Sequence, residues 1–166
     1  MNSKWKCAWL FKQVRGGKII WQDKIHNLLV TEGNKAITDV FLRANDALYF
    51  LNTDFYVGFY RGSISKSTVL ATIPGEPSGN GYSRTVIERS NVGFPTIELD
   101  DDGDWRVVSK EVTITATGGS IGPIDGGFLG TSSDNAGSLI GVVATSVQRT
   151  ILSGDSMIIQ LKAKIQ

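Results

Sequence analysis

Apolar and polar residues alternate along most of this chain of 166 residues, with the period of two that puts successive side chains on opposite faces of a β-strand. In 112–117, for example, three apolar residues alternate with three threonines. Similar segments, separated by clusters of small and polar residues, lie at 54–61, 81–88, 104–117, 126–130, 138–145 and 155–165. This spacing is typical of a mainly β protein, and we expect an antiparallel, jelly-roll-like β-sandwich.

One segment has the period of a helix instead. Its apolar positions fall on one face at helical spacing and are Ala36, Ile37, Val40 and Phe41. We expect one short α-helix at about 32–43. Thr31 is the expected N-cap, and Glu32 lies at the positive end of the helix dipole.

The N-terminal segment predicts a β-hairpin, because residues 4–14 and 18–25 flank a pair of turn-forming glycines. The length suits one domain, and no internal repeat or low-complexity linker marks a second. We therefore predict a single β-sandwich domain at 26–166. The hairpin at 1–25 is predicted to project from it as an assembly arm.

The composition is that of a globular protein, with 41% hydrophobic and 20% charged residues. The formal net charge of +1 gives no overall field that would attract nucleic acid or a membrane, so we expect neither as a partner. No stretch reaches the roughly 18 apolar residues that span a bilayer. Lysines interrupt the early apolar run, so we expect no signal peptide. Cys7 is alone, which excludes an intrachain disulfide.

The charges are distributed unevenly. Residues 1–26 hold six Lys or Arg and one Asp, while 76–104 holds seven acids and two arginines. Two solvated faces would explain this pattern. The alternative is that basic and acidic segments of neighbouring copies attract each other.

The sequence offers little catalytic chemistry. His26 and Cys7 are the single members of their types, so one chain cannot assemble a zinc site from several His and Cys ligands. The one G-x-S-x-G match, GGSIG at 118–122, lies between β segments and not at the strand-to-helix turn that a nucleophile elbow needs. GNGYSR lacks both the third glycine and the following helix of a phosphate loop. We expect no enzyme activity, no catalytic residue, no cofactor and no metal, and a small-molecule ligand is not expected.

The acidic run ELDDDGD at 98–104 is the feature most like a site. It fails the calcium-loop pattern, because Ser109 would occupy the closing bidentate position. Asp102 and Gly103 are typical of a hairpin turn with charges on its rim. We favour the turn, and an adventitious cation site stays the alternative.

The stretch EPSGNGYSR at 76–84 is interpreted as a structural turn. Pro77, Gly79 and Gly81 turn the chain, the two glycines with positive φ, and Tyr82 begins the next strand. An ion pair between Glu76 and Arg84 is expected to brace the base of this turn.

Three stretches, in order, resemble small bacteriophage virion proteins. HNLLVTEGNKAITDVFLR (26–43) resembles their N-L-V-x-x-G entry to a short helix, and FYVGFYRG (55–62) resembles their W/Y-V-G-L strand. EPSGNGYSR is similar to their E-x-S-G-x-G-Y-A-R stretch, and a late Gly154-Asp155 before an alternating strand also fits. The N-terminal segment 4–25 has no counterpart in this resemblance.

The resemblance implies a non-enzymatic virion structural protein, made in the cytoplasm of the host bacterium. Such proteins are labelled tail fibre, minor tail or capsid decoration protein. We expect a symmetric homo-oligomer, with a trimer favoured on its fit to virion symmetry, that binds the major capsid or other virion proteins as a cement or head–tail component. The alternatives are a tail-fibre module that binds host receptors and, from another class, a carbohydrate-binding or hydrolytic domain.

The arm is the expected interface, because four large aromatic residues and six basic residues within 25 positions suit an oligomer contact. The predicted interface residues are Trp5, Trp9, Phe11, Arg15 and Trp21, opposite Asp100, Asp101 and Asp102 of another copy. The alternative is that the hairpin completes the sheet of its own domain.

Overall fold

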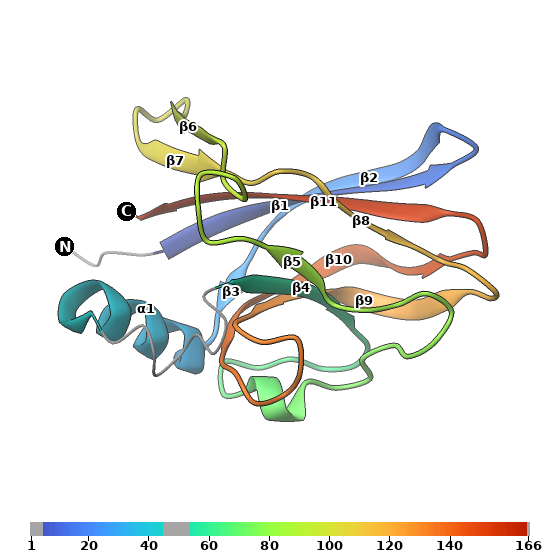
Figure 1. Cartoon of the computed structure of the whole chain (residues 1–166), viewed down its shortest axis with the longest axis horizontal. Helices are drawn as coiled ribbons and strands as arrows, with labels where there is room; N and C mark the ends of the chain where they lie inside the picture. The colour runs from blue at the N-terminus through green and yellow to red at the C-terminus, as the bar shows by residue number, and fades with distance from the viewer. Residues whose placement is uncertain (1–4, 45–53, 166) are drawn as a thin grey trace.

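The computed structural model describes residues 5–44 and 54–165, which form two antiparallel β-sheets packed face to face (Figure 1). The predicted β-sandwich with one α-helix and an N-terminal hairpin is confirmed within this part of the chain. In chain order the elements are β1 (Trp5–Arg15), β2 (Lys18–His26), β3 (Leu28–Leu29), α1 (Thr31–Arg43), β4 (Phe55–Tyr60), η1 (Leu70–Thr72), β5 (Thr85–Ile87), β6 (Thr96–Leu99), β7 (Trp105–Val108), β8 (Val112–Thr115), β9 (Ile121–Gly130), β10 (Leu139–Ile151) and β11 (Ser156–Ile165).

The N-terminal hairpin belongs to the larger sheet, whose strand order is β2-β1-β11-β7-β6, with β8 also paired to β11. β1 pairs with β11 along ten residues, from Trp5 opposite Ile165 to Val14 opposite Ser156. β1 is therefore an interior strand, and the hairpin completes the sheet of its own domain. The predicted division into an arm at 1–25 and a domain at 26–166 is wrong as a structural boundary, because long-range pairing to the C-terminal strand joins the two parts.

The second sheet has the strand order β3-β10-β9-β4-β5. β4 lies between β9 and β5, and its last four residues are buried. The outer face of this sheet carries a smaller apolar cluster that includes Tyr60, Leu70 and Phe128. η1 supplies Leu70, so the loop that contains η1 packs against that face.

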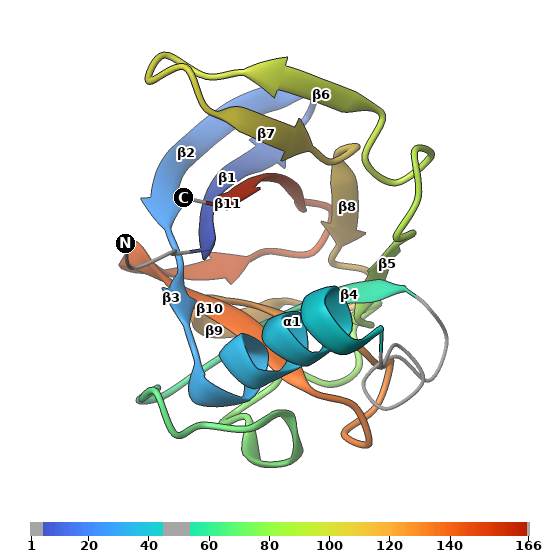
Figure 2. The same cartoon turned by 90° about the vertical axis from the view of Figure 1, so that its left-hand side faces the viewer.

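α1 lies at one end of the sandwich (Figure 2). The helix begins at Thr31 with Val30 as its N-cap, and no side chain caps it, so the predicted cap by Thr31 is wrong. The Glu32 carboxylate instead accepts the backbone N–H groups of Leu70 and Leu139, at 3.1 and 2.6 Å. Glu32 thereby ties the start of the helix to the second sheet. No helix in the described ranges is long and apolar enough to cross a membrane.

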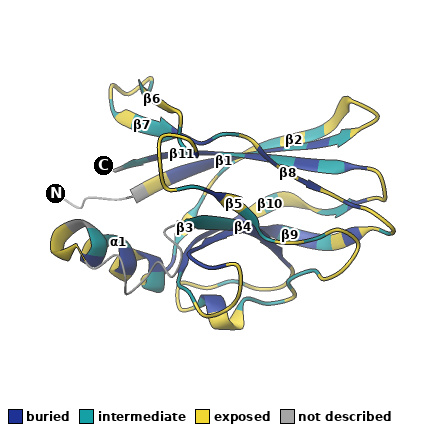
Figure 3. Cartoon of the chain, viewed as in Figure 1, coloured by how far each residue is buried: buried dark blue, intermediate teal, exposed yellow. Residues whose placement is uncertain are grey.

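The main core lies between the two sheets and takes side chains from both (Figure 3). Trp9 and Phe11 of β1 stack with ring centroids 5.8 Å apart and are completely or almost completely buried. A Cβ built on Gly127 of β9 would lie about 3.0 Å from Trp9 and 3.1 Å from Phe11. The glycine of β9 therefore makes room for the two aromatic rings of the opposite sheet.

Candidate functional site

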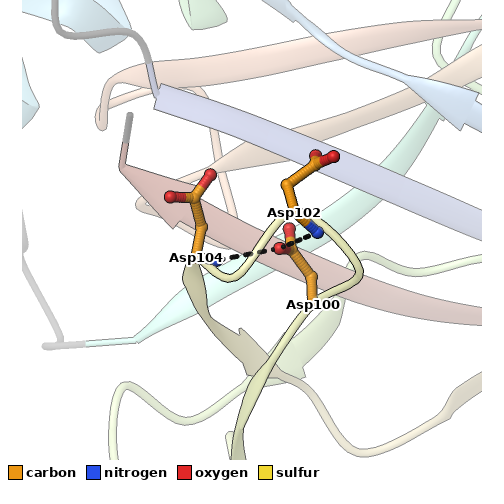
Figure 4. A group of neighbouring side chains, drawn as sticks. All are labelled: Asp100, Asp102 and Asp104. Atoms are coloured by element: carbon orange, nitrogen blue, oxygen red, sulfur yellow. Dashed lines mark hydrogen bonds between the residues drawn. The ribbon is translucent and has the colours of Figure 1, made fainter.

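The acidic run forms the turn between β6 and β7, as the sequence predicts. The two strands pair from Thr96 opposite Val108 to Leu99 opposite Trp105. Within the turn, a carboxylate oxygen of Asp100 accepts the backbone N–H groups of Asp102 and Asp104, both at 3.0 Å (Figure 4). The Asp100 side chain thus stabilises the turn through hydrogen bonds to the backbone two and four residues later, as aspartate side chains commonly do in turns.

The carboxylates of this turn surround the ammonium group of Lys164 on β11. The Nζ atom lies 2.5 Å from Asp100, 3.3 Å from Asp102 and 3.0 Å from Asp104. The hydrogen bond with Asp100 raises the pKa of Lys164 and lowers the pKa of Asp100. Carboxylate oxygens of the three aspartates lie within 4.8 Å of one another, but Lys164 already supplies the positive charge that a metal ion would bring.

This arrangement changes the interpretation of the acidic run as a contact between copies. Asp100 is almost buried and is paired with Lys164 of its own chain. The prediction that Asp100 faces a neighbouring copy is therefore wrong, because Lys164 of the same chain neutralises its charge. Asp101 and Asp102 lie on the surface, so a contact through these two residues stays a prediction.

The β6–β7 hairpin also exposes an apolar face that sequence reasoning missed. Ile97, Leu99 and Trp105 are 67%, 55% and 62% exposed. The strand register puts these side chains on one face of the hairpin, with Leu99 directly opposite Trp105. Glu98 and Arg106 form an ion pair on the other face, at 2.7 Å. We call the surface of Ile97, Leu99 and Trp105 the apolar hairpin face.

The sequence itself contains the alternation of apolar and polar residues in this hairpin. TIEL alternates, and in WRVV Trp105 and Val107 lie on either side of Arg106, which predicts one apolar face and one face with charged residues. The sequence could not show that the tip of the hairpin extends past the core (Figure 1). On this face Val107, opposite Ile97, packs against the core, while Ile97, Leu99 and Trp105 stay exposed. β6 is also an edge strand of its sheet.

The glycine turn at 76–84 has the predicted architecture. Gly79 and Gly81 have φ angles of 72° and 81°. Arg84 binds the Glu76 carboxylate through both Nε and Nη2, at 2.8 and 2.6 Å, so the predicted brace is confirmed. Pro77, the residue after Glu76, is half-buried. β5 begins at Thr85 and not at Tyr82, so the predicted start of the strand is wrong.

Tyr82 does not start a strand but connects the turn to the second sheet through hydrogen bonds. Its hydroxyl group donates to Glu76 at 2.8 Å and accepts the backbone N–H of Phe59 at 2.9 Å. Burial raises the pKa of Tyr82 well above its usual value. The Arg84 guanidinium also lies over the ring of Phe128, 5.0 Å from its centroid. The turn is therefore anchored to two strands of the second sheet, and its groups are used structurally.

The predicted interface residues of the arm are mostly engaged within the chain. Trp9 and Phe11 are core residues, so the prediction that they contact a partner is wrong. Arg15 binds Asp155 with two hydrogen bonds of 2.8 Å. Trp21 is half-buried and lies under the guanidinium of Arg149, at 4.9 Å from the ring centroid. The side chain of Trp5 lies outside the described residues.

Cys7 and His26 lie on opposite sides of the larger sheet. Cys7 is buried in the core, and burial raises its pKa to about 12. His26 is exposed at the end of β2 and is paired in register with Ala8, one residue after Cys7. Because neighbouring residues of a strand point to opposite faces, the two side chains cannot form a catalytic dyad.

Comparisons with models of protein families, with curated proteins and with solved structures find no match to this chain. The function is therefore inferred from the chain itself. Two surfaces of the larger sheet offer material for such an inference: the apolar hairpin face and a charged groove between the hairpin and the outer face of the sheet.

Proposed function

We propose that this protein is a non-enzymatic bacteriophage virion structural protein that binds copies of itself and other virion proteins. The observation that carries the proposal is the apolar hairpin face. A tryptophan, an isoleucine and a leucine exposed side by side form the kind of surface that marks a protein contact. Aromatic anchors of this size supply much of the binding energy in interfaces.

A second copy of this chain fits the hairpin. β6 has an unpaired edge, and an edge strand with an apolar face is open to association with another chain. In a cyclic oligomer each subunit presents the same hairpin near the symmetry axis, so the exposed side chains bury one another. We favour a trimer, on its fit to virion symmetry.

The resemblance to small virion proteins supports the same function. The most similar stretch, EPSGNGYSR, forms a braced turn whose polar groups bind one another and the second sheet. The stretch therefore has a structural role in the fold. We place the protein as a capsid decoration or cement protein or in the head–tail region. A tail-fibre receptor module is the alternative.

The test uses the full chain and a variant with Leu99→Ser and Trp105→Ser. We expect the wild type to form a discrete oligomer in sedimentation analysis and the variant to be monomeric with unchanged circular dichroism. Val92→Ser is the matched control, because Val92 is also an exposed apolar residue but lies outside the hairpin.

Incorporation into particles tests the virion role separately. Electron microscopy of particles assembled with the wild type should show the protein on the virion, and particles assembled with the double variant should lack it. A monomeric wild type, or a double variant that still forms the oligomer, would contradict the role of the apolar hairpin face. An oligomer that never joins particles would contradict the virion role.

A further inference from the structure

A charged groove lies between the β6–β7 hairpin and the outer face of the larger sheet. Its volume is about 370 Å³, which is within the range of pockets that hold small ligands. Strands β1, β2 and β11 form the floor, and the hairpin turn with Asp100, Asp101 and Asp102 forms the opposite wall. Segments far apart in the sequence therefore meet at this groove.

The strand register puts basic side chains around a small residue in the floor. Ala8 of β1 is paired with Lys162 of β11 on one side and with His26 of β2 on the other. Lys6 lies two positions before Ala8 on the same strand, and Lys24 lies two positions before His26. Directly paired residues have Cβ atoms about 5 Å apart and diagonal ones about 7 to 8 Å, so these side chains can reach one ligand above Ala8.

Part of this positive charge is not neutralised within the described chain. Lys164 binds the aspartates of the turn, and Lys162 lies 4.0 Å from Glu98, which also pairs with Arg106. No ion pair joins Lys6 or Lys24 to an acid among the residues that the structure describes. Two unpaired lysines with an exposed histidine between their strands form a site for an oxyanion, such as a phosphate or a carboxylate.

The opposite wall of the groove is acidic. Asp101 and Asp102 are exposed and offer carboxylate oxygens, which accept hydrogen bonds. Lys164 occupies one oxygen of Asp102, at 3.3 Å, so an oxyanion alone would leave Asp101 and the second oxygen of Asp102 unused and would be repelled by them. A ligand that also carries hydroxyl donors can satisfy the lysines and the aspartates at once.

We propose that this groove binds an acidic saccharide, with its oxyanion on the floor at Lys6, Lys24 and His26 and its hydroxyl groups on Asp101 and Asp102. The groove is lined by Arg106, which lies on the other face of the hairpin from the apolar hairpin face. The sequence offered a carbohydrate-binding domain as an alternative but could not locate this site, because the floor is assembled from strands far apart in the chain.

The test is a titration of the full-length protein with galacturonate, followed by amide chemical shifts in NMR spectra. Galactose lacks the oxyanion and acetate lacks the hydroxyl groups, so both should bind at least about tenfold more weakly than galacturonate.

Variants locate the site. Lys24→Ala should weaken galacturonate binding about tenfold, and Asp101→Asn should reduce the preference for galacturonate over acetate. Lys18→Ala is the matched control, because Lys18 is an exposed lysine on the same strand that does not line the groove. The proposal is overturned by absence of saturable binding, by acetate binding as tightly as galacturonate, or by equal losses in the Lys24 and Lys18 variants.

Discussion

The guanidinium of Arg84 and the carboxylate of Glu76 form an ion pair at 2.6 Å, although the Arg84 side chain is only 4% exposed. Arg84 also donates to the backbone carbonyls of Ser132 and Asp134. One side chain thus connects the glycine turn to the loop between β9 and β10. Removing one partner of a buried ion pair leaves the other charge uncompensated, which strongly destabilises the folded state.

Replacing Arg84 by methionine should lower the free energy of unfolding by about 3 to 5 kcal/mol, because Glu76 keeps its charge in a poorly solvated position. Chemical denaturation measures the change. Arg106→Met is the matched control, since the pair of Arg106 with Glu98 is more exposed and should contribute only about 0 to 1 kcal/mol. Equal losses in the two variants would contradict a special role for the turn.

The two glycines of the turn should differ in their tolerance of alanine. Gly79→Ala should cost about 1 kcal/mol, because φ is positive but no atom lies within 4 Å of the added Cβ. Gly81→Ala should cost clearly more, since its Cβ would lie 2.4 Å from the Thr117 hydroxyl and 2.9 Å from the Thr115 carbonyl. Thermal unfolding of both variants checks the order, and a less stable Gly79 variant would refute it.

Deleting residues 1–25 should abolish cooperative folding. The deletion removes β1, which pairs with β11, and takes Trp9 and Phe11 out of the core. Circular dichroism and proton NMR of the truncated chain measure the loss. Lys18→Ala, which changes only the exposed end of the hairpin, should fold normally. A truncated protein that stays folded would restore the interpretation of this segment as a detachable arm.

Stability should decrease in acid because of Asp155. Its hydrogen bonds with Arg15 lower its pKa below the ordinary value of 3.8. The unfolded state therefore binds a proton more readily, so this contribution is present above pH 3.8 and is lost as the pH falls through the folded-state pKa. Urea unfolding between about pH 2 and pH 6 should show a shallower pH dependence for Asp155→Asn than for the wild type. An identical dependence would remove Asp155 from the explanation.

Features set by short-range chemistry could be predicted from the sequence. The period of the apolar residues gave the strands and the helix, because each needs only its own segment to present one apolar face. Likewise, Gly79 and Gly81 required positive φ, and the acid-rich turn at 100–104 required a hairpin. The ion pair of Glu76 with Arg84 spans only eight residues, so the local turn brings its partners together.

The tertiary structure decided which surfaces are free, because pairing between distant strands sets burial. β11 makes β1 an interior strand, so Trp9 and Phe11 became core residues although their composition suited an interface. Pairing of β11 with β7 brings Lys164 to the aspartates, and pairing of β1 with β11 and β2 puts Ala8 among basic side chains. By contrast, Trp105 became a surface residue because its hairpin extends past the core. A strand pattern shows which residues share a face, but only the packed sheets determine what covers that face.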